Sequence, residues 1–232
     1  MFSRKLTRSI VVGAAAIAVA GGSYGIVSAT FSSSPAAASS GFAGGHGSGG
    51  GGSNARSGPA AGGASGTVGS VSTSSFTMTT SAGQKVTVGE ASSTAYQKGT
   101  GSTSASAITT GERVLVLGTT SGTTITAAQV IVQPAGGGSA TSPAKVIPFQ
   151  RGAPATSKQV GQIPANWSQG SGTIVSGTAA NKATEAALAA YPGGIVDRVV
   201  KLSNGDYNVH YIGVNWPHHV FVNQDFKVVG AE

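Results

Sequence analysis

The sequence contains no cysteine, which excludes disulfide bonds, thiolate metal sites and thiol catalysis together. Charged residues make up only 9% of the chain, and it has just two tryptophans. Any hydrophobic core must therefore be small and built mainly from valine, isoleucine and threonine. Glycine is abundant instead, at 37 of 232 residues, and this composition favours two small domains over one large one.

The excess of basic residues does not have the pattern of a nucleic-acid-binding protein. The chain has 14 lysines and arginines against 7 acidic residues, and Arg4, Lys5 and Arg8 lie at the N-terminus. Without these three, 11 basic residues remain, and they form no cluster interleaved with aromatic residues. We therefore expect no nucleic-acid partner.

Residues 1–29 have the order of an export signal. The basic residues precede an uncharged run from Ile10 to Ala20, and small residues at 27–29 offer a cleavage site. This order predicts a signal peptide that is cleaved to release a secreted protein. The alternative is a retained N-terminal transmembrane helix with the C-terminus outside. Both alternatives place the rest of the chain outside the cytoplasm, in contact with the membrane only through this segment.

Two stretches of low complexity separate the predicted domains. Residues 30–64 consist mainly of Ser, Ala and Gly, a composition that predicts a disordered linker. Residues 134–172 predict a second flexible linker, interrupted by apolar patches at 146–149 and 163–167. Both patches contain proline, which argues against central strands. They either dock on a domain or bind a partner in extended form.

Residues 65–133 predict a small all-β domain. Short runs rich in Val, Ile and Thr alternate with Gly/Ser/Thr turns, which is typical of a small barrel or closed sheet. The run I-T-T-G-E-R-V-L-V-L-G, followed by T-I-T-A-A-Q-V-I-V, resembles bacterial all-β domains of unknown function. This resemblance implies an OB-like barrel.

Residues 173–232 predict a compact α+β domain. An apolar stripe and a capping threonine indicate a helix over Thr178–Tyr191, ended by Pro192. Strands are predicted over 195–202, 207–214 and 218–222, with a possible short fourth at 226–229, and Asn204-Gly205 is a hairpin turn. The fold class is therefore two small domains, all-β and then one helix on an antiparallel sheet of three to four strands, joined by disordered linkers.

The second predicted domain carries a more specific resemblance. The run A-A-Y-P-G-G-I-V-D-R-V-V, then G-D-Y-N-V, then V-F-V-N-Q-D-F-K-V-V, resembles the PepSY family over residues 178–232. The family occurs in protease propeptides and in exported or membrane proteins, and its members are proposed to bind and inhibit peptidases. The resemblance brings no catalytic residue and no cofactor.

Three histidines are candidate metal ligands in the second domain. A hairpin centred near Asn215 predicts that His210 pairs near Val220, with His218 and His219 on opposite faces. At most two imidazoles then converge, and no acidic residue is near them in sequence. The interpretation without metal is that these are exposed histidines at strand ends.

The sequence thus predicts a non-enzymatic protein of the cell envelope that binds a protein or peptide partner. No G-x-S-x-G or H-E-x-x-H motif occurs. Strand addition at a sheet edge is the expected binding mode. Two alternatives remain open, an inhibitor of an exported peptidase and a metal-responsive domain that uses the histidines. The predicted partner-binding residues are Tyr207, Tyr211, Trp216, His218 and Phe221.

Overall fold

The computed structural model describes residues 58–134, 145–153 and 158–232. The predicted signal or anchor at residues 1–29, and most of the predicted linker at 30–64, lie outside the described residues. Within the described ranges, no helix is both long and apolar enough to cross a membrane.

Five strands of the N-terminal half (residues 60–133) form a closed circuit. Strand β1 (Ala60–Val71) pairs with β2 (Ser75–Thr79) and with β5 (Arg113–Ser121). Strand β3 (Lys85–Lys98) joins β2 to β6 (Thr124–Gln133), and β6 returns to β5. The β3–β6 pair is parallel and the other pairs of the circuit are antiparallel. Alternating apolar residues fill its interior, among them Phe76, Met78, Val86, Val88 and Val130.

The two remaining elements of this half are short. Strand β4 (Gly101–Ser102) pairs with the end of β3, and a single 3-10 turn spans Ala105–Ala107. The tight β5–β6 hairpin uses Gly122 with a φ of 58°, a conformation that glycine adopts without strain.

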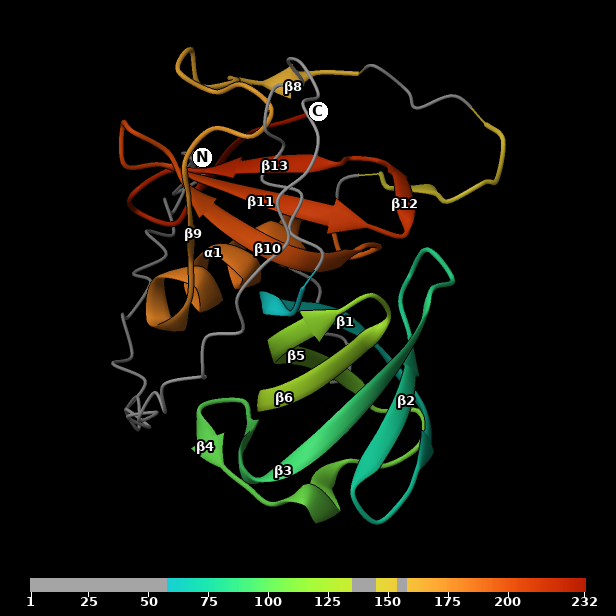
Figure 1. The fold of residues 1–232 in the computed structure, drawn as a ribbon. Coiled ribbons are helices and arrows are strands. Elements are labelled where there is room, and N and C mark those ends of the chain that lie inside the picture. Colours follow the sequence, from blue (N-terminus) through green and yellow to red (C-terminus); the bar gives the residue numbers. More distant parts are fainter. Residues whose placement is uncertain (1–57, 135–144, 154–157) are drawn as a thin grey trace, which may run out of the picture. The chain divides into compact units, whose positions relative to one another are not determined.

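The C-terminal half (residues 158–232) places one helix on an antiparallel meander. Helix α1 (Gly177–Ala190) follows β9 (Thr173–Val175). The meander consists of β10 (Ile195–Lys201), β11 (Tyr207–Ile212), β13 (His219–Val222) and β14 (Val228–Ala231). Figure 1 shows α1 behind β10 and β11. The Asn204-Gly205 turn joins β10 to β11, with Gly205 at a φ of 90°.

The predicted fold class is wrong, because the two predicted domains do not have a sheet each: their strands are joined in one large sheet. Residues Gly63 and Ala64 of β1 pair with Val196 and Ile195 of β10. This pairing joins the strands into one twelve-stranded mixed sheet, in the order β2-β3-β6-β5-β1-β10-β11-β13-β14-β8 with β4 and β9 attached at its side.

The hydrophobic cores also cross the predicted domain boundary. Ile195 of β10 packs in the core of the N-terminal half, while Leu115 and Leu117 of β5 pack in the core that contains α1. The Thr80 hydroxyl donates a buried hydrogen bond of 2.7 Å to the Gly193 carbonyl. The two halves therefore share one sheet, and each contributes residues to the core of the other.

Both apolar patches of residues 134–172 dock on the C-terminal half. Strand β7 (Ile147–Pro148) pairs with β12 (Val214–Trp216) in a separate two-stranded sheet. The second patch packs on the main sheet through Trp167, whose ring lies 5.2 Å from that of Phe221 on β13 between centroids. Just before this patch, strand β8 (Val160–Gly161) pairs with β14 at the end of the main sheet. Of the two alternatives for these patches, the structure shows docking.

Candidate functional site

The candidate site lies on the face of the C-terminal meander that is turned away from α1. Alternation along β11 directs Tyr207, Val209 and Tyr211 into the core beneath the helix. Asn208 and His210 therefore point to the opposite face, where His219 of β13 lies beside them.

Residues 158–171, here called the covering segment, pack over this face. The indole of Trp167 lies 5.0 Å from the His219 ring and 5.2 Å from the Phe221 ring, measured between centroids. The Trp216 Nε1 donates a hydrogen bond of 2.7 Å to the Lys158 carbonyl, and Asn166 Nδ2 donates one of 2.7 Å to Ser203 Oγ. These contacts hold the start and the middle of the covering segment against the C-terminal half.

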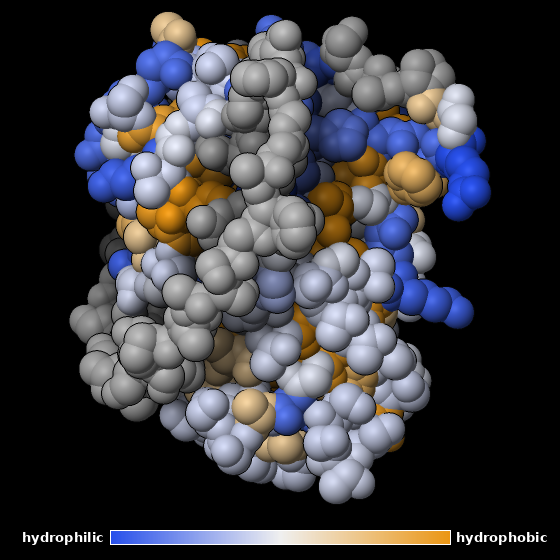
Figure 2. Space-filling model, in the orientation of Figure 1, coloured by the Kyte–Doolittle hydropathy of each residue, from blue (hydrophilic) through white to orange (hydrophobic). Residues whose placement is uncertain are grey.

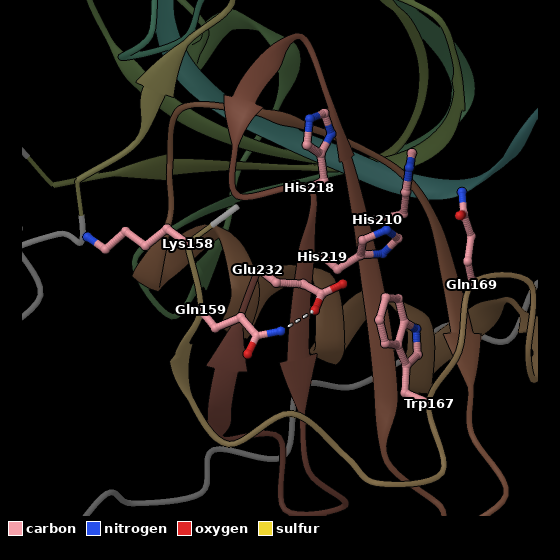
Figure 3. Close-up of a pocket in the computed structure, with 8 residues that line it drawn as sticks. All are labelled: Lys158, Gln159, Trp167, Gln169, His210, His218, His219 and Glu232. Atoms are coloured by element: carbon pink, nitrogen blue, oxygen red, sulfur yellow. Dashed lines mark hydrogen bonds between the residues drawn. The ribbon is translucent and has the colours of Figure 1, made fainter. Parts of the chain in front are cut away.

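A cavity of about 570 Å³ lies between the covering segment and the sheet (Figure 3). The covering segment and the sheet both contribute to its wall, and β14 leads into Glu232. Gln159 Nε2 donates a hydrogen bond of 3.3 Å to the Glu232 carboxylate. The lining residues are Lys158, Gln159, Trp167, Gln169, His210, His218, His219 and Glu232.

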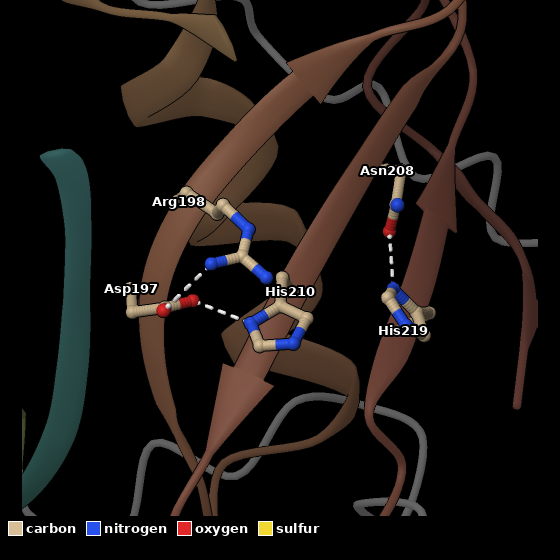
Figure 4. Close-up of polar contacts among 5 residues, drawn as sticks. All are labelled: Asp197, Arg198, Asn208, His210 and His219. Carbon is tan, nitrogen blue, oxygen red and sulfur yellow. Dashed lines mark hydrogen bonds and ion pairs between the residues drawn. The ribbon is translucent and has the colours of Figure 1, made fainter. Parts of the chain in front are cut away.

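His210 and His219 are direct register partners on β11 and β13. Their rings are 5.0 Å apart between centroids, in an edge-to-face arrangement. His210 Nδ1 bonds the Asp197 carboxylate at 2.5 Å, and His219 Nδ1 bonds the Asn208 side-chain oxygen at 3.0 Å (Figure 4). The sequence placed the partner of His210 near Val220, and the structure shows it to be the preceding residue, His219.

A β-bulge brings Asp197 to the histidines. Val196 pairs with Tyr211 and Arg198 with His210, so Asp197 is the extra residue on β10. Its carboxylate also forms a 3.3 Å ion pair with Arg198. The acidic partner of His210 is not apparent from the sequence, because Asp197 belongs to a neighbouring strand.

Burial controls the charge of this site. It lowers the pKa of His219 to about 3, with further lowering by the positive charges of His210, His218 and Arg198 and a smaller opposing effect of Asp197. The His219 ring is therefore neutral at physiological pH. Burial also raises the pKa of the Glu232 carboxyl, opposed by its hydrogen bond from Gln159.

The five predicted partner-binding residues differ in how accessible they are to a partner. Tyr207, Tyr211, Trp216 and Phe221 are all buried, so a partner reaches them only if the chain that covers them moves. His218 is partly exposed and lines the cavity.

The other predicted metal candidates, His210 and His219, also line the cavity. His218 points away from this pair in Figure 3. Among the described residues, no group of three or more histidine and acidic side chains could hold a metal ion.

The sequence pattern did not indicate the cavity residues of the covering segment. Lys158, Gln159 and Gln169 lie in a stretch predicted as linker, and nothing in the local pattern distinguishes them. The one available signal was the apolar patch around Trp167.

Comparisons with protein-family models, with curated proteins and with solved structures found no match to this chain.

Proposed function

We propose that this protein is an exported, non-enzymatic component of the cell envelope whose C-terminal half binds a protein or peptide partner. The observation that supports this proposal is the cavity of about 570 Å³ beneath the covering segment. The export signal expected at residues 1–29 supports a location outside the cytoplasm. The resemblance to the PepSY family supports a protein partner and makes an exported peptidase the first class to test.

The chemistry of the cavity wall suits an extended peptide. Trp167 offers an aromatic surface, and the amides of Gln159 and Gln169 can each donate and accept hydrogen bonds. A peptide backbone needs both donors and acceptors, because each of its residues carries an N–H and a C=O group.

The sheet edge beside the cavity offers backbone hydrogen bonds as well. Strand β8 is the last strand in the order of the main sheet and contains only Val160 and Gly161. The Val160 side chain is 40% exposed, and Gln159, the residue before it, lines the cavity. We therefore propose that a partner strand adds along β8 and places its side chains in the cavity.

Site-specific photo-crosslinking tests this proposal. A photoreactive amino acid replaces Gln169 in the full-length exported protein, and the matched control carries it at Thr119, an exposed residue of β5. We expect a crosslinked envelope protein from position 169 and none from position 119. Mass spectrometry identifies the adduct and the crosslinked peptide, which is then synthesised. Equal crosslinking from both positions contradicts the proposal.

Titration of the synthetic peptide gives the second measurement. We expect Trp167→Ala to weaken binding by about tenfold or more, as for a buried aromatic anchor. The thermal unfolding midpoint of each variant shows whether it is folded, and Gln169→Ala tests the same cavity without removing an aromatic ring. Wild-type affinity in both variants would contradict the proposed site.

A further inference from the structure

The hydrogen bonds of His210 and His219 fix the tautomer of each ring. The Asp197 carboxylate and the Asn208 side-chain oxygen are acceptors, so each Nδ1 carries the proton and donates. When a ring is in its neutral form, its lone pair is then on Nε2. Neither Nε2 forms a hydrogen bond with another described residue.

These hydrogen bonds are the type that orients metal-binding histidines. A histidine that binds a metal through one nitrogen usually donates its other N–H to a carboxylate or a carbonyl oxygen. The His210–Asp197 contact provides the carboxylate, and the His219–Asn208 contact provides the amide oxygen (Figure 4).

The spacing of the two ring centroids permits a shared ion. With Zn–N distances of about 2.0–2.1 Å and a tetrahedral angle at the metal, two imidazole centroids that share one ion lie about 5 Å apart. The His210 and His219 centroids are 5.0 Å apart. Both residues line the cavity, so an ion can reach them (Figure 3).

We propose that His210 and His219 together bind one divalent transition-metal ion of the zinc and copper class through their Nε2 atoms. Imidazole nitrogen suits zinc, copper and nickel, whereas calcium and magnesium require oxygen ligands. With two protein ligands, the remaining coordination positions are open to water. The site does not depend on the proposed peptide binding, because the purified protein alone can be tested for it.

The chain permits a matched pair of variants, since it contains only four histidines. His46→Ala/His218→Ala leaves only the proposed pair, and His210→Asn/His219→Gln leaves only the other two. The proteins are purified without a histidine tag and titrated calorimetrically with Zn²⁺ near neutral pH. We expect the first variant to bind one ion like the wild type and the second to lose this binding.

A measurement on the wild-type protein keeps the test decisive if His210→Asn/His219→Gln does not fold. With one equivalent of Cu²⁺, electron spin-echo envelope modulation counts the imidazoles bound to the ion, and we expect two.

Asp197→Asn, which keeps the shape but not the charge of the side chain, should weaken Zn²⁺ binding by about 10–100-fold. A wild-type dissociation constant weaker than roughly 1 mM, fewer than two imidazoles, or equal uptake by both histidine variants overturns the proposal.

Discussion

The two halves of the sheet differ in the side chains that they display. On the face seen in Figure 2, the half with β2–β6 has a pale surface, whereas strongly hydrophilic and hydrophobic residues gather over the half with β10–β14. Both tryptophans and three of the four histidines belong to the C-terminal half. The side chains suited to binding are therefore concentrated in the C-terminal half, while the N-terminal half completes the sheet and core of its neighbour.

The largest expected effect comes from a substitution that creates a cavity in the core of the N-terminal half. Phe76 is 2% exposed there, and Phe76→Ala should lower the free energy of unfolding by about 3–5 kcal/mol. Because the two halves share a sheet and exchange core residues, the loss should also appear in the C-terminal half. Urea unfolding followed by tryptophan fluorescence reports on that half alone.

Phe149→Ala is the matched control for this prediction. Phe149 is 56% exposed, so its replacement should change the free energy of unfolding by less than about 0.5 kcal/mol. A tryptophan transition that keeps its wild-type midpoint in Phe76→Ala would show that the halves unfold independently.

A smaller effect is expected where β1 meets β10. A Cβ atom at Gly62 would collide with the Val196 carbonyl oxygen, a backbone atom that cannot rotate away. Gly62→Ala should therefore destabilise the protein by about 1–3 kcal/mol in the same urea experiment.

Gly89→Ala is the control for the junction. Gly89 lies within β3, and the atom nearest to its added Cβ is 4.0 Å away. Alanine should be tolerated there, or stabilise by about 0.5–1 kcal/mol relative to glycine. Equal destabilisation by the two substitutions would argue against a close approach specific to the junction.

The smallest expected effect is the pH dependence of stability due to Tyr96 in the N-terminal half. Burial, together with the 2.8 Å hydrogen bond that the Tyr96 hydroxyl donates to Glu90, raises the pKa of Tyr96 to about 12. Since the folded protein favours the neutral phenol, this contribution to stability is complete below pH 10 and lost as the pH rises towards 12. NMR of ¹³C-labelled tyrosine, assigned with Tyr96→Phe, measures the titration.

Glu90→Gln separates the two causes of this shift. It removes the carboxylate and should move the pKa of Tyr96 downwards, while the part due to burial remains. An unshifted pKa of 10 in the wild-type protein would contradict the packing described for this residue.

Local patterns were enough to predict most individual elements. The helix was expected over Thr178–Tyr191 and spans Gly177–Ala190, and the Asn204-Gly205 hairpin turn is present. The β1–β10 pairing could not be predicted, because residues 60–64 are only alanine and glycine. Their small size permits the close approach of the two strands, but it carries no β-strand signal.

The candidate site was partly predictable. The strand pattern placed His210 and His219 on neighbouring strands, but the register was off by one residue. Asp197 and Trp167 reach the site through a bulge and through the covering segment, respectively. Such contacts depend on tertiary packing and leave no periodic signal in the sequence.

Because the halves exchange core residues, neither half can be transferred to another gene as a complete folding unit. A fragment that ends at Gln133 would lack Ile195 from its core, and a fragment that begins at 158 would lack Leu115 and Leu117. Each fragment would also expose the strand edge where β1 meets β10. Recombination that moved either half alone into another gene would transfer an incomplete unit, so the two halves should be found together.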